Sequence, residues 1–372
     1  MPIWMTLTFL SVVGLISSGI HLYVLSRVDA SLASSLSDSL LVTSALVLLS
    51  LCYFVIGRWL TPRRAWVRLL AWCSGIWLGA LVYLSLWAAS DQLLSLALTE
   101  ALSAPYWWII CALLTTVYGL WSGTRPPVIR RVELTIPRLS RELDGLKIAQ
   151  LSDIHIGPTL GERFAAELAR RTAALSPDLI VITGDLVDGS VERLREDVEP
   201  LITMSAPLGL YFVTGNHELI SAADPWVSYL KERGVRVLEN EGLQLRRQGA
   251  TLNLAGVEDW EGSRFPPPRP PSLSDALEGL DPEAPTILLA HQPKAAREAA
   301  ERGVALQLSG HTHGGQMFPF SLLIYLDQPY RSGLYEVGGM KLYVSEGTGY
   351  WGPPLRVGTR SELTLITLRS PS

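Results

Sequence analysis

The chain has 372 residues, of which 48% are hydrophobic and 18% charged, and its formal net charge is −4. This mild acidity, together with the lack of a basic stretch interleaved with aromatic residues, argues against nucleic acid as a partner. The mean hydropathy of +0.25 is high for a wholly soluble protein, and the apolar residues are concentrated in the first third of the chain.

Residues 1–124 are predicted to form a transmembrane region with four helices. Four apolar stretches in this region contain no Asp, Glu, Lys or Arg, and each is about long enough to cross a hydrocarbon core of roughly 30 Å. Lipid cannot hydrogen-bond to a bare backbone, so such segments are expected to be helical. The alternative is a set of buried core helices. The predicted spans are 3–26, 39–57, 69–89 and 105–123.

The distribution of arginine predicts the orientation of these spans. The loop 58–68 contains four arginines, and three more lie between positions 125 and 131, whereas the loops 27–38 and 90–104 contain one and none. Because short loops rich in Lys and Arg stay in the cytoplasm, both termini are predicted to be cytoplasmic. We therefore expect a multi-pass membrane protein in which residues 125–372 are cytoplasmic. A cleaved secretory signal at 1–26 is a weaker alternative, since no basic residue precedes its apolar run.

Residues 125–372 are predicted to form a separate α/β domain. After two prolines at 126–127, short apolar and β-branched runs of strand length alternate with helix-like stretches such as 162–175 and 225–233. This alternation is typical of a layered domain around a buried sheet. The predicted strands are 146–152, 178–183, 209–214, 286–289, 304–309 and 341–345.

Side chains that bind metal ions follow most of these strands. Five of the six histidines are placed in this way. The alternative is that each is an ordinary packed histidine, but this would require five independent coincidences. Imidazole, carboxylate and amide oxygen suit borderline and hard divalent cations, and ligands gather at strand ends in α/β proteins. The three cysteines all fall in predicted spans, so His, Asp and Asn must hold any metal in the soluble domain. The candidate ligands are Asp153, His155, Asp185, Asn216, His291, His311 and His313.

The order of these motifs resembles the calcineurin-like metallophosphoesterase family over about residues 145–346. The matching motifs are DxH at 153–155, GD at 184–185, GNHE at 215–218, His291 and GHTH at 310–313. The segments LSDIH at 151–155, GHTHGGQ at 310–316 and GTGYWGPP at 347–354 further resemble the membrane-associated bacterial branch with the YkuE and YaeI type phosphodiesterases. That branch is also similar to enzymes that cleave the pyrophosphate of UDP-diacylglucosamine. The resemblance implies a four-layer αββα sandwich.

The resemblance also implies a role for each residue. It places Asp153, His155, Asp185 and His313 around one metal, with Asp185 shared, and Asn216, His291 and His311 around a second. His217 would lie near the scissile phosphate as a proton donor or charge stabiliser. Glu218 would either orient His217 or be a solvated carboxylate at a helix start. Attack by metal-bound hydroxide would need no protein nucleophile. Two divalent metal ions are expected. Manganese is the favoured metal, and iron or zinc also suits these ligands.

Two further features concern the substrate. Protein Ser/Thr phosphatases of the family carry an arginine in a GDxVDRG motif, whereas here Asp188 is followed by Gly189 and Ser190, which makes a phosphoprotein substrate less favoured. The apolar segment 317–326 is either part of the core or a flap that dips into the bilayer interface and admits an acyl chain. Four arginines are candidates for a phosphate contact or are ordinary surface cations: Arg163, Arg264, Arg331 and Arg356.

The prediction is thus a membrane-anchored, dinuclear-metal phosphoesterase that hydrolyses a phosphoester or pyrophosphate bond in a lipid or lipid-linked substrate. One alternative keeps the enzyme but gives it soluble nucleotides or cyclic phosphodiesters as substrates. The other is a membrane scaffold that binds metal without catalysis.

Overall fold

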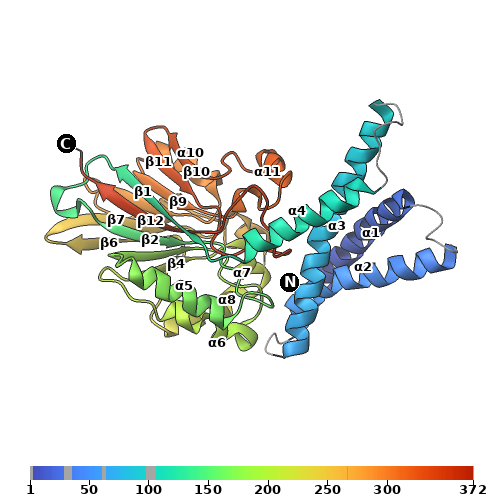
Figure 1. The fold of residues 1–372 in the computed structure, drawn as a ribbon. Coiled ribbons are helices and arrows are strands. Elements are labelled where there is room, and N and C mark those ends of the chain that lie inside the picture. Colours follow the sequence, from blue (N-terminus) through green and yellow to red (C-terminus); the bar gives the residue numbers. More distant parts are fainter. Residues whose placement is uncertain (1–2, 29–35, 61–63, 98–105, 266, 372) are drawn as a thin grey trace. The chain divides into compact units, whose positions relative to one another are not determined.

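The computed structural model describes residues 3–28, 36–60, 64–97, 106–265 and 267–371. The chain divides into two compact units (Figure 1). The helical unit comprises Met1–Arg125 with Trp351–Val357, and the α/β unit comprises Pro126–Tyr350 with Gly358–Ser372. A short segment from the far end of the chain thus joins the helical unit.

Four long helices make up most of the helical unit, one at each predicted span. Two helical stretches among the described residues, Thr6–Arg27 and Ala65–Ala97, are long and apolar enough to cross a membrane, and a third apolar stretch, Leu41–Ile56, is shorter. Two candidate spans are thus supported rather than four. Residues 29–35, 61–63 and 98–105, which include Arg63 of the predicted cytoplasmic loop, lie outside the described residues. The helices are α1 (Ile3–Arg27), α2 (Leu36–Trp59), α3 (Ala65–Ala97) and α4 (Trp107–Thr124).

Two six-stranded mixed sheets form the centre of the α/β unit. The first has the strand order β1-β12-β2-β3-β4-β5 and the second β10-β11-β9-β8-β7-β6. The six predicted strands correspond to β2, β3, β4, β8, β9 and β11. In the first sheet the strands are β1 (Val128–Thr135), β12 (Glu362–Arg369), β2 (Lys147–Leu151), β3 (Leu179–Thr183), β4 (Leu210–Val213) and β5 (Arg236–Val237). In the second they are β10 (Gly333–Val337), β11 (Met340–Val344), β9 (Leu306–Ser309), β8 (Thr286–Leu289), β7 (Ala250–Gly256) and β6 (Glu241–Arg247).

Helices cover the outer faces of both sheets, so the unit has the layer order helix, sheet, sheet, helix (Figure 1). Side chains of α5, α6 and α8 pack on the first sheet, and those of α9 and α10 pack on the second. A third cluster fills the space between the sheets, where Val181 of β3 and Leu254 of β7 are fully buried. The helices are α5 (Glu162–Ala174), α6 (Val191–Ile202), α7 (Asn216–Ile220), α8 (Ala223–Glu232), α9 (Leu273–Leu277), α10 (Ala296–Glu301) and α11 (Phe320–Leu323). The 3-10 turns are η2 (Arg141–Leu143), η3 (Trp260–Arg264), η4 (Pro293–Ala295), η5 (His313–Gly315) and η6 (Ile324–Leu326).

The register of the parallel strands brings their carboxyl ends to one edge. In the first sheet Leu151 of β2 pairs with Ile182 of β3, and Thr183 pairs with Val213 of β4. The two sheets are joined near this edge by the buried amide of Gln150, which donates to Thr183 Oγ1 at 3.0 Å and to Ser309 O at 3.0 Å. The loops after β2, β3, β4, β8 and β9 can therefore meet.

The apolar segment 317–326 forms α11 and η6 beyond the last histidines. Two of its residues, Met317 and Ser321, are almost completely buried and anchor the segment. Six of its large side chains are nevertheless exposed, with Leu322 at 61% and Leu326 at 85%. The core alternative for this segment is therefore wrong. The remaining exposed members are Phe318, Phe320, Leu323 and Tyr325.

Candidate metal centre

The loops that follow the strands turn back sharply at the predicted ligands. The backbone φ angle is positive at Asp153, His155, Asp185, His311 and His313, although none of them is glycine. Such left-handed conformations cost of order 1 kcal/mol or more for an ordinary side chain and are found where a site imposes them. Backbone hydrogen bonds join the loop after β2 to the loop after β3. In one of them the N–H of His155 donates to Asp185 O at 3.0 Å.

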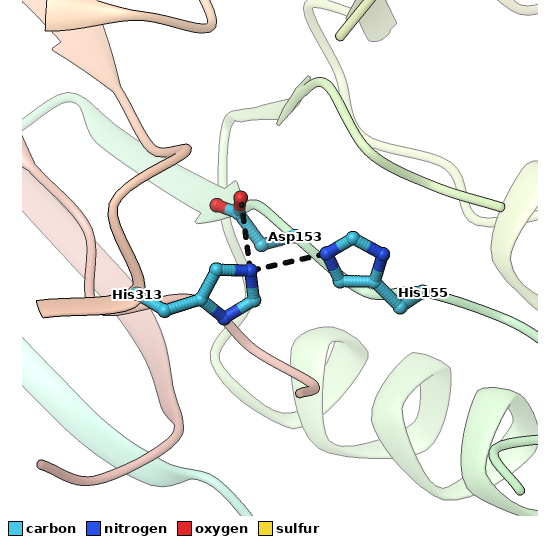
Figure 2. Close-up of side chains that lie close together, drawn as sticks. All are labelled: Asp153, His155 and His313. Carbon is cyan, nitrogen blue, oxygen red and sulfur yellow. Dashed lines mark hydrogen bonds and ion pairs between the residues drawn. The ribbon is translucent and has the colours of Figure 1, made fainter. Parts of the chain in front are cut away.

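Asp153, His155 and His313 form the first cluster. Their side chains point toward one another (Figure 2) and all three residues are buried. His155 Nε2 lies 3.1 Å from His313 Nε2, which in turn lies 3.5 Å from Asp153 Oδ1. The ligand atoms of the three residues all lie within 4.8 Å of one another, a spacing that one cation can bridge.

The second cluster contains Asp185, Asn216, His291 and His311. His291 Nε2 lies 3.2 Å from both Asp185 Oδ2 and Asn216 Oδ1. His311 Nδ1 lies 3.0 Å from Asn216 Oδ1 and 3.3 Å from His291 Nε2. Asp185 Oδ2 is also 3.8 Å from His155 Nε2, so this carboxylate lies between the two clusters. The structure thus brings all seven predicted ligands together, with the Asp185 carboxylate between the two clusters.

The hydrogen bonds behind the clusters show that this donor set fits divalent cations. The Nδ1 of His291 lies 2.8 Å from Thr183 O, a pure acceptor, so Nδ1 carries a proton and Nε2 is the nitrogen that points toward Asp185 and Asn216. His155 Nδ1 likewise faces Asp188 Oδ1 at 2.9 Å, which leaves Nε2 free to face His313. Lone pairs that converge at about 3 Å repel one another unless a cation lies among them.

The charges in the clusters also shift the titration of the histidines. Burial lowers the pKa of His291, but the adjacent Asp185 carboxylate outweighs burial and raises the pKa well above its ordinary value. Burial and the positive charge of His291 together lower the pKa of His311 to about 3. The pKa values of these two neighbouring imidazoles are therefore shifted in opposite directions, and the Asp185 carboxylate lies directly against His291.

His217 lies at the edge of both clusters. Its backbone N–H donates to Asp185 Oδ1 at 2.8 Å, and its ring lies edge-on to the ring of His155 with centroids 4.6 Å apart. The Nδ1 atom of His217 is 2.6 Å from Asp188 Oδ1. Burial lowers the pKa of His217, but the charges of Asp185 and Asp188 outweigh burial and raise it to about 9. A positively charged His217 can donate a proton or stabilise negative charge on a phosphate.

Asp188 is a site residue that the sequence analysis missed. Its Oδ1 atom accepts hydrogen bonds from both His155 and His217, and these two rings hold the pKa of the buried carboxyl below its ordinary value even though burial raises it. The signal in the sequence is its position three residues after Asp185. A search for the carboxylate that orients the histidines could have found it there.

Glu218 has a different environment from either predicted one. Its side chain is 1% exposed, so the solvated alternative is wrong. The carboxylate binds the backbone of the loop after β3 and the start of α7, while the ring of His217 is oriented by Asp188. Glu218 thus positions the loop that carries Asp185. The donors are the N–H groups of Asp185, Leu186, Val187 and Gly215, at 2.9, 2.8, 3.2 and 2.7 Å.

The four candidate arginines lie in different surroundings. Arg163 and Arg264 are exposed, and Arg264 pairs with Glu261 at 3.2 Å. Arg356 is fully buried in the helical unit. Arg331 has a carbonyl that accepts a hydrogen bond from Thr312, which lies between two ligand histidines. Of the four, Arg331 is the one whose backbone contacts the ligand segment.

Replacing Asp188 with Asn is expected to lower the Mn²⁺ affinity or the turnover of the protein about 10–100-fold. Asn keeps the size of the side chain but removes the charge that both His155 and His217 face, and outer-sphere partners of ligating histidines have effects of this order. Calorimetric titration with Mn²⁺ and steady-state kinetics would measure the change. The matched control is Asp275→Asn, at an exposed position of α9. Equal affinity and turnover in Asp188→Asn and Asp275→Asn would contradict this role.

Comparisons with known proteins agree with this geometry. The calcineurin-like phosphoesterase family matches residues 146–315. A transmembrane protein with metallophosphoesterase domain from Danio rerio is 38% identical over 323 residues, which cover 82% of this chain and 74% of the relative. The protein of the same name from Bos taurus is 40% identical over 314 residues, covering 82% and 68%. The uncharacterized metallophosphoesterase YkuE of Bacillus subtilis is 31% identical over 263 residues, covering 68% and 90%.

The chain belongs to the calcineurin-like metallophosphoesterase family, as its motifs indicated. It is therefore a metal-dependent phosphoesterase, and the seven clustered side chains are its candidate metal-binding residues. The transmembrane relatives, together with two apolar helices, indicate association with a membrane.

Proposed function

We propose that the protein is a membrane-anchored phosphoesterase that holds two divalent cations and hydrolyses a phosphoester or pyrophosphate bond in a lipid or lipid-linked substrate. The observation that carries the two-cation part is the position of Asp185, whose Oδ2 lies 3.8 Å from His155 Nε2 in one cluster and 3.2 Å from His291 Nε2 in the other. Asp153, His155 and His313 would hold one cation with Asp185, and Asn216, His291 and His311 the other.

The residues of this chain would divide the chemistry in the following way. Bound divalent cations supply positive charge to the phosphate oxygens and make water a better nucleophile at neutral pH. His217, charged and fixed by Asp188, donates a hydrogen bond to the phosphate or a proton to the leaving oxygen. Arg331 is the arginine we propose for a phosphate contact, since its carbonyl is bound by Thr312.

Manganese is the metal we propose, with iron and zinc as alternatives. The ligand set mixes imidazole nitrogen with carboxylate and amide oxygen, which all three metals accept. Elemental analysis of protein purified without added metal distinguishes them.

Two features support a substrate in the membrane. The exposed side chains of the segment 317–326 make an apolar surface that begins at Phe318, five residues after His313, and such surfaces contact membranes or apolar ligands. The helical unit is covalently joined to the catalytic unit, which would raise the effective concentration of a substrate held in the same bilayer. A soluble nucleotide would gain from neither feature.

For the topology we propose four membrane passes, with the catalytic unit on the cytoplasmic face of a bacterial inner membrane. Support comes from the helix at each predicted span and from the arginines in the loop 58–68 and at 125–131. Activity of a periplasmic reporter fused to the carboxyl terminus would contradict this orientation.

The substrate class can be tested by comparing metal-dependent turnover of bis-p-nitrophenyl phosphate, a cyclic nucleotide and UDP-diacylglucosamine. We expect Leu326→Ser to raise KM for the lipid substrate and to leave turnover of the soluble diester unchanged, because only the acyl chain would contact this surface. Leu334→Ser, at another exposed leucine of the same unit, is the matched control. Indifference of the parent protein to lipid substrates, with turnover of the cyclic nucleotide, would favour the soluble alternative.

A further inference from the structure

The segment Trp351–Val357 packs in the helical unit, although both of its neighbours in the chain belong to the α/β unit. Leu355 and Arg356 are fully buried, and the N–H of Arg356 donates to the carbonyl of Gly119 in α4 at 2.9 Å. This segment, here called the docking loop, contains the last four residues of the GTGYWGPP motif, 351–354. These four residues are not among the candidate metal ligands.

Four glycines on two helices make room for the docking loop. Gly75 and Gly79 in α3, and Gly119 and Gly123 in α4, are each four residues apart and so lie on one face of their helix. A Cβ atom at Gly79 would lie 2.8 Å from the side chain of Leu355. A Cβ atom at Gly123 would lie 2.6 Å from the backbone oxygen of Pro354, which cannot rotate away. The loop is therefore closely fitted to the two helix faces.

The chain just before the docking loop is hydrogen-bonded to the first ligand loop of the metal centre. Thr348 N–H donates to Ser152 O at 2.7 Å, and Ser152 N–H donates to Thr348 Oγ1 at 3.2 Å. The N–H of Gly349 donates to the carbonyl of Asp153 itself at 2.9 Å. Any shift of residues 348–349 would therefore move the backbone that carries Asp153 and His155.

The chain just after the docking loop contacts the last ligand turn. Thr359 Oγ1 donates to Gln316 O at 2.9 Å, three residues after the ligand His313. Arg360 N–H donates to Glu346 Oε2 at 3.0 Å, and a Cβ atom at Gly314 would lie 3.2 Å from the other oxygen of Glu346. The two stems of one loop thus hold the two segments that form the first ligand cluster.

We propose that α3 and α4 grip the docking loop and thereby set the geometry and the metal affinity of the Asp153, His155 and His313 cluster. Leu355 and Arg356 of the loop are fully buried, and its two stems continue directly into the residues that contact the ligand loops. Outer contacts of this kind change metal affinity about 10–100-fold when they are lost. The inference makes the helical unit a positioning element of the site as well as an anchor. It rests on the metal-binding part of the proposed function and on no particular substrate.

The test is Gly123→Ala in the full-length protein in nanodiscs, titrated with Mn²⁺ by calorimetry. The added methyl group must displace the backbone of the docking loop, and we expect the Kd for Mn²⁺ to rise about tenfold. Turnover of bis-p-nitrophenyl phosphate should recover at saturating Mn²⁺, which loss of folding would not allow. Gly19→Ala is the matched control, because a Cβ atom there meets nothing within 4 Å.

Two further variants keep the proposal testable if Gly123→Ala does not fold. Thr348→Val removes the hydroxyl that accepts from Ser152, and Leu355→Ala removes packing of the docking loop against α3 and α4. Each should also weaken Mn²⁺ binding. Parent-like Mn²⁺ affinity in the folded variants would overturn this proposal alone. A parent protein that binds no Mn²⁺ would overturn the proposed metal site and this inference with it.

Discussion

Replacing His217 with Ala is expected to lower kcat for phosphodiester hydrolysis about 10²–10⁴-fold while Mn²⁺ binding is retained. His217 is held by Asp188 at 2.6 Å, and loss of a positioned acid or charge stabiliser has effects of this order. The seven ligand side chains remain in this variant, so the metal affinity should stay close to that of the parent. Steady-state kinetics and Mn²⁺ calorimetry on the same preparation would separate the two properties.

Asp185→Asn provides the companion measurement. This substitution removes the charge shared by both clusters, so we expect metal affinity and turnover to fall together. Asp275→Asn, at an exposed carboxylate of α9, controls for the change from Asp to Asn. If both Asp185→Asn and His217→Ala kept the full specific rate in purified protein, the catalytic assignment would be wrong and the scaffold alternative would be favoured.

Glu218→Ala is expected to have the largest effect on stability. The variant leaves four buried backbone N–H groups without their acceptor, and each lost partner costs about 1–3 kcal/mol. The α/β unit should therefore lose at least about 4 kcal/mol of its free energy of unfolding. At roughly 2–4 °C per kcal/mol for a unit of this size, Tm should fall by about 10 °C or more.

Glu218→Gln is the control for that measurement. Glutamine preserves the shape and one acceptor oxygen, so its Tm should lie between those of the parent and Glu218→Ala. Calorimetry of the full-length protein in detergent would give the three values. A Glu218→Ala variant that melts with the parent would show that the four hydrogen bonds do not stabilise the loop.

Six of the strands could be predicted from the sequence. β2, β3, β4, β8, β9 and β11 are buried runs of apolar residues, and the sequence analysis found all six. β1 and β12 were missed. They pair in parallel across more than 200 residues, from Val128 with Glu362 onward, and β1 exposes charged side chains. Their pairing depends on long-range contacts that no local pattern records.

The membrane region shows how much of the structure composition alone can predict. Apolar stretches without charges predicted helices correctly, because an apolar backbone segment has few other ways to satisfy its hydrogen bonds. Length and hydropathy support two of them as spans among the described residues. The part played by Trp351–Val357 could not be predicted, because its contacts are with glycines more than 200 residues away.

By itself the sequence determined the chemistry of the site: which seven side chains can bind metal, their order along the chain, and their places at the ends of strands. Ligand chemistry is local, since each donor atom belongs to one residue type. Only the tertiary structure decided that Asp185 lies between the clusters, that Asp188 orients His155 and His217, and that Glu218 binds backbone. Those roles depend on distances between loops from different strands, and the packing of two sheets sets such distances.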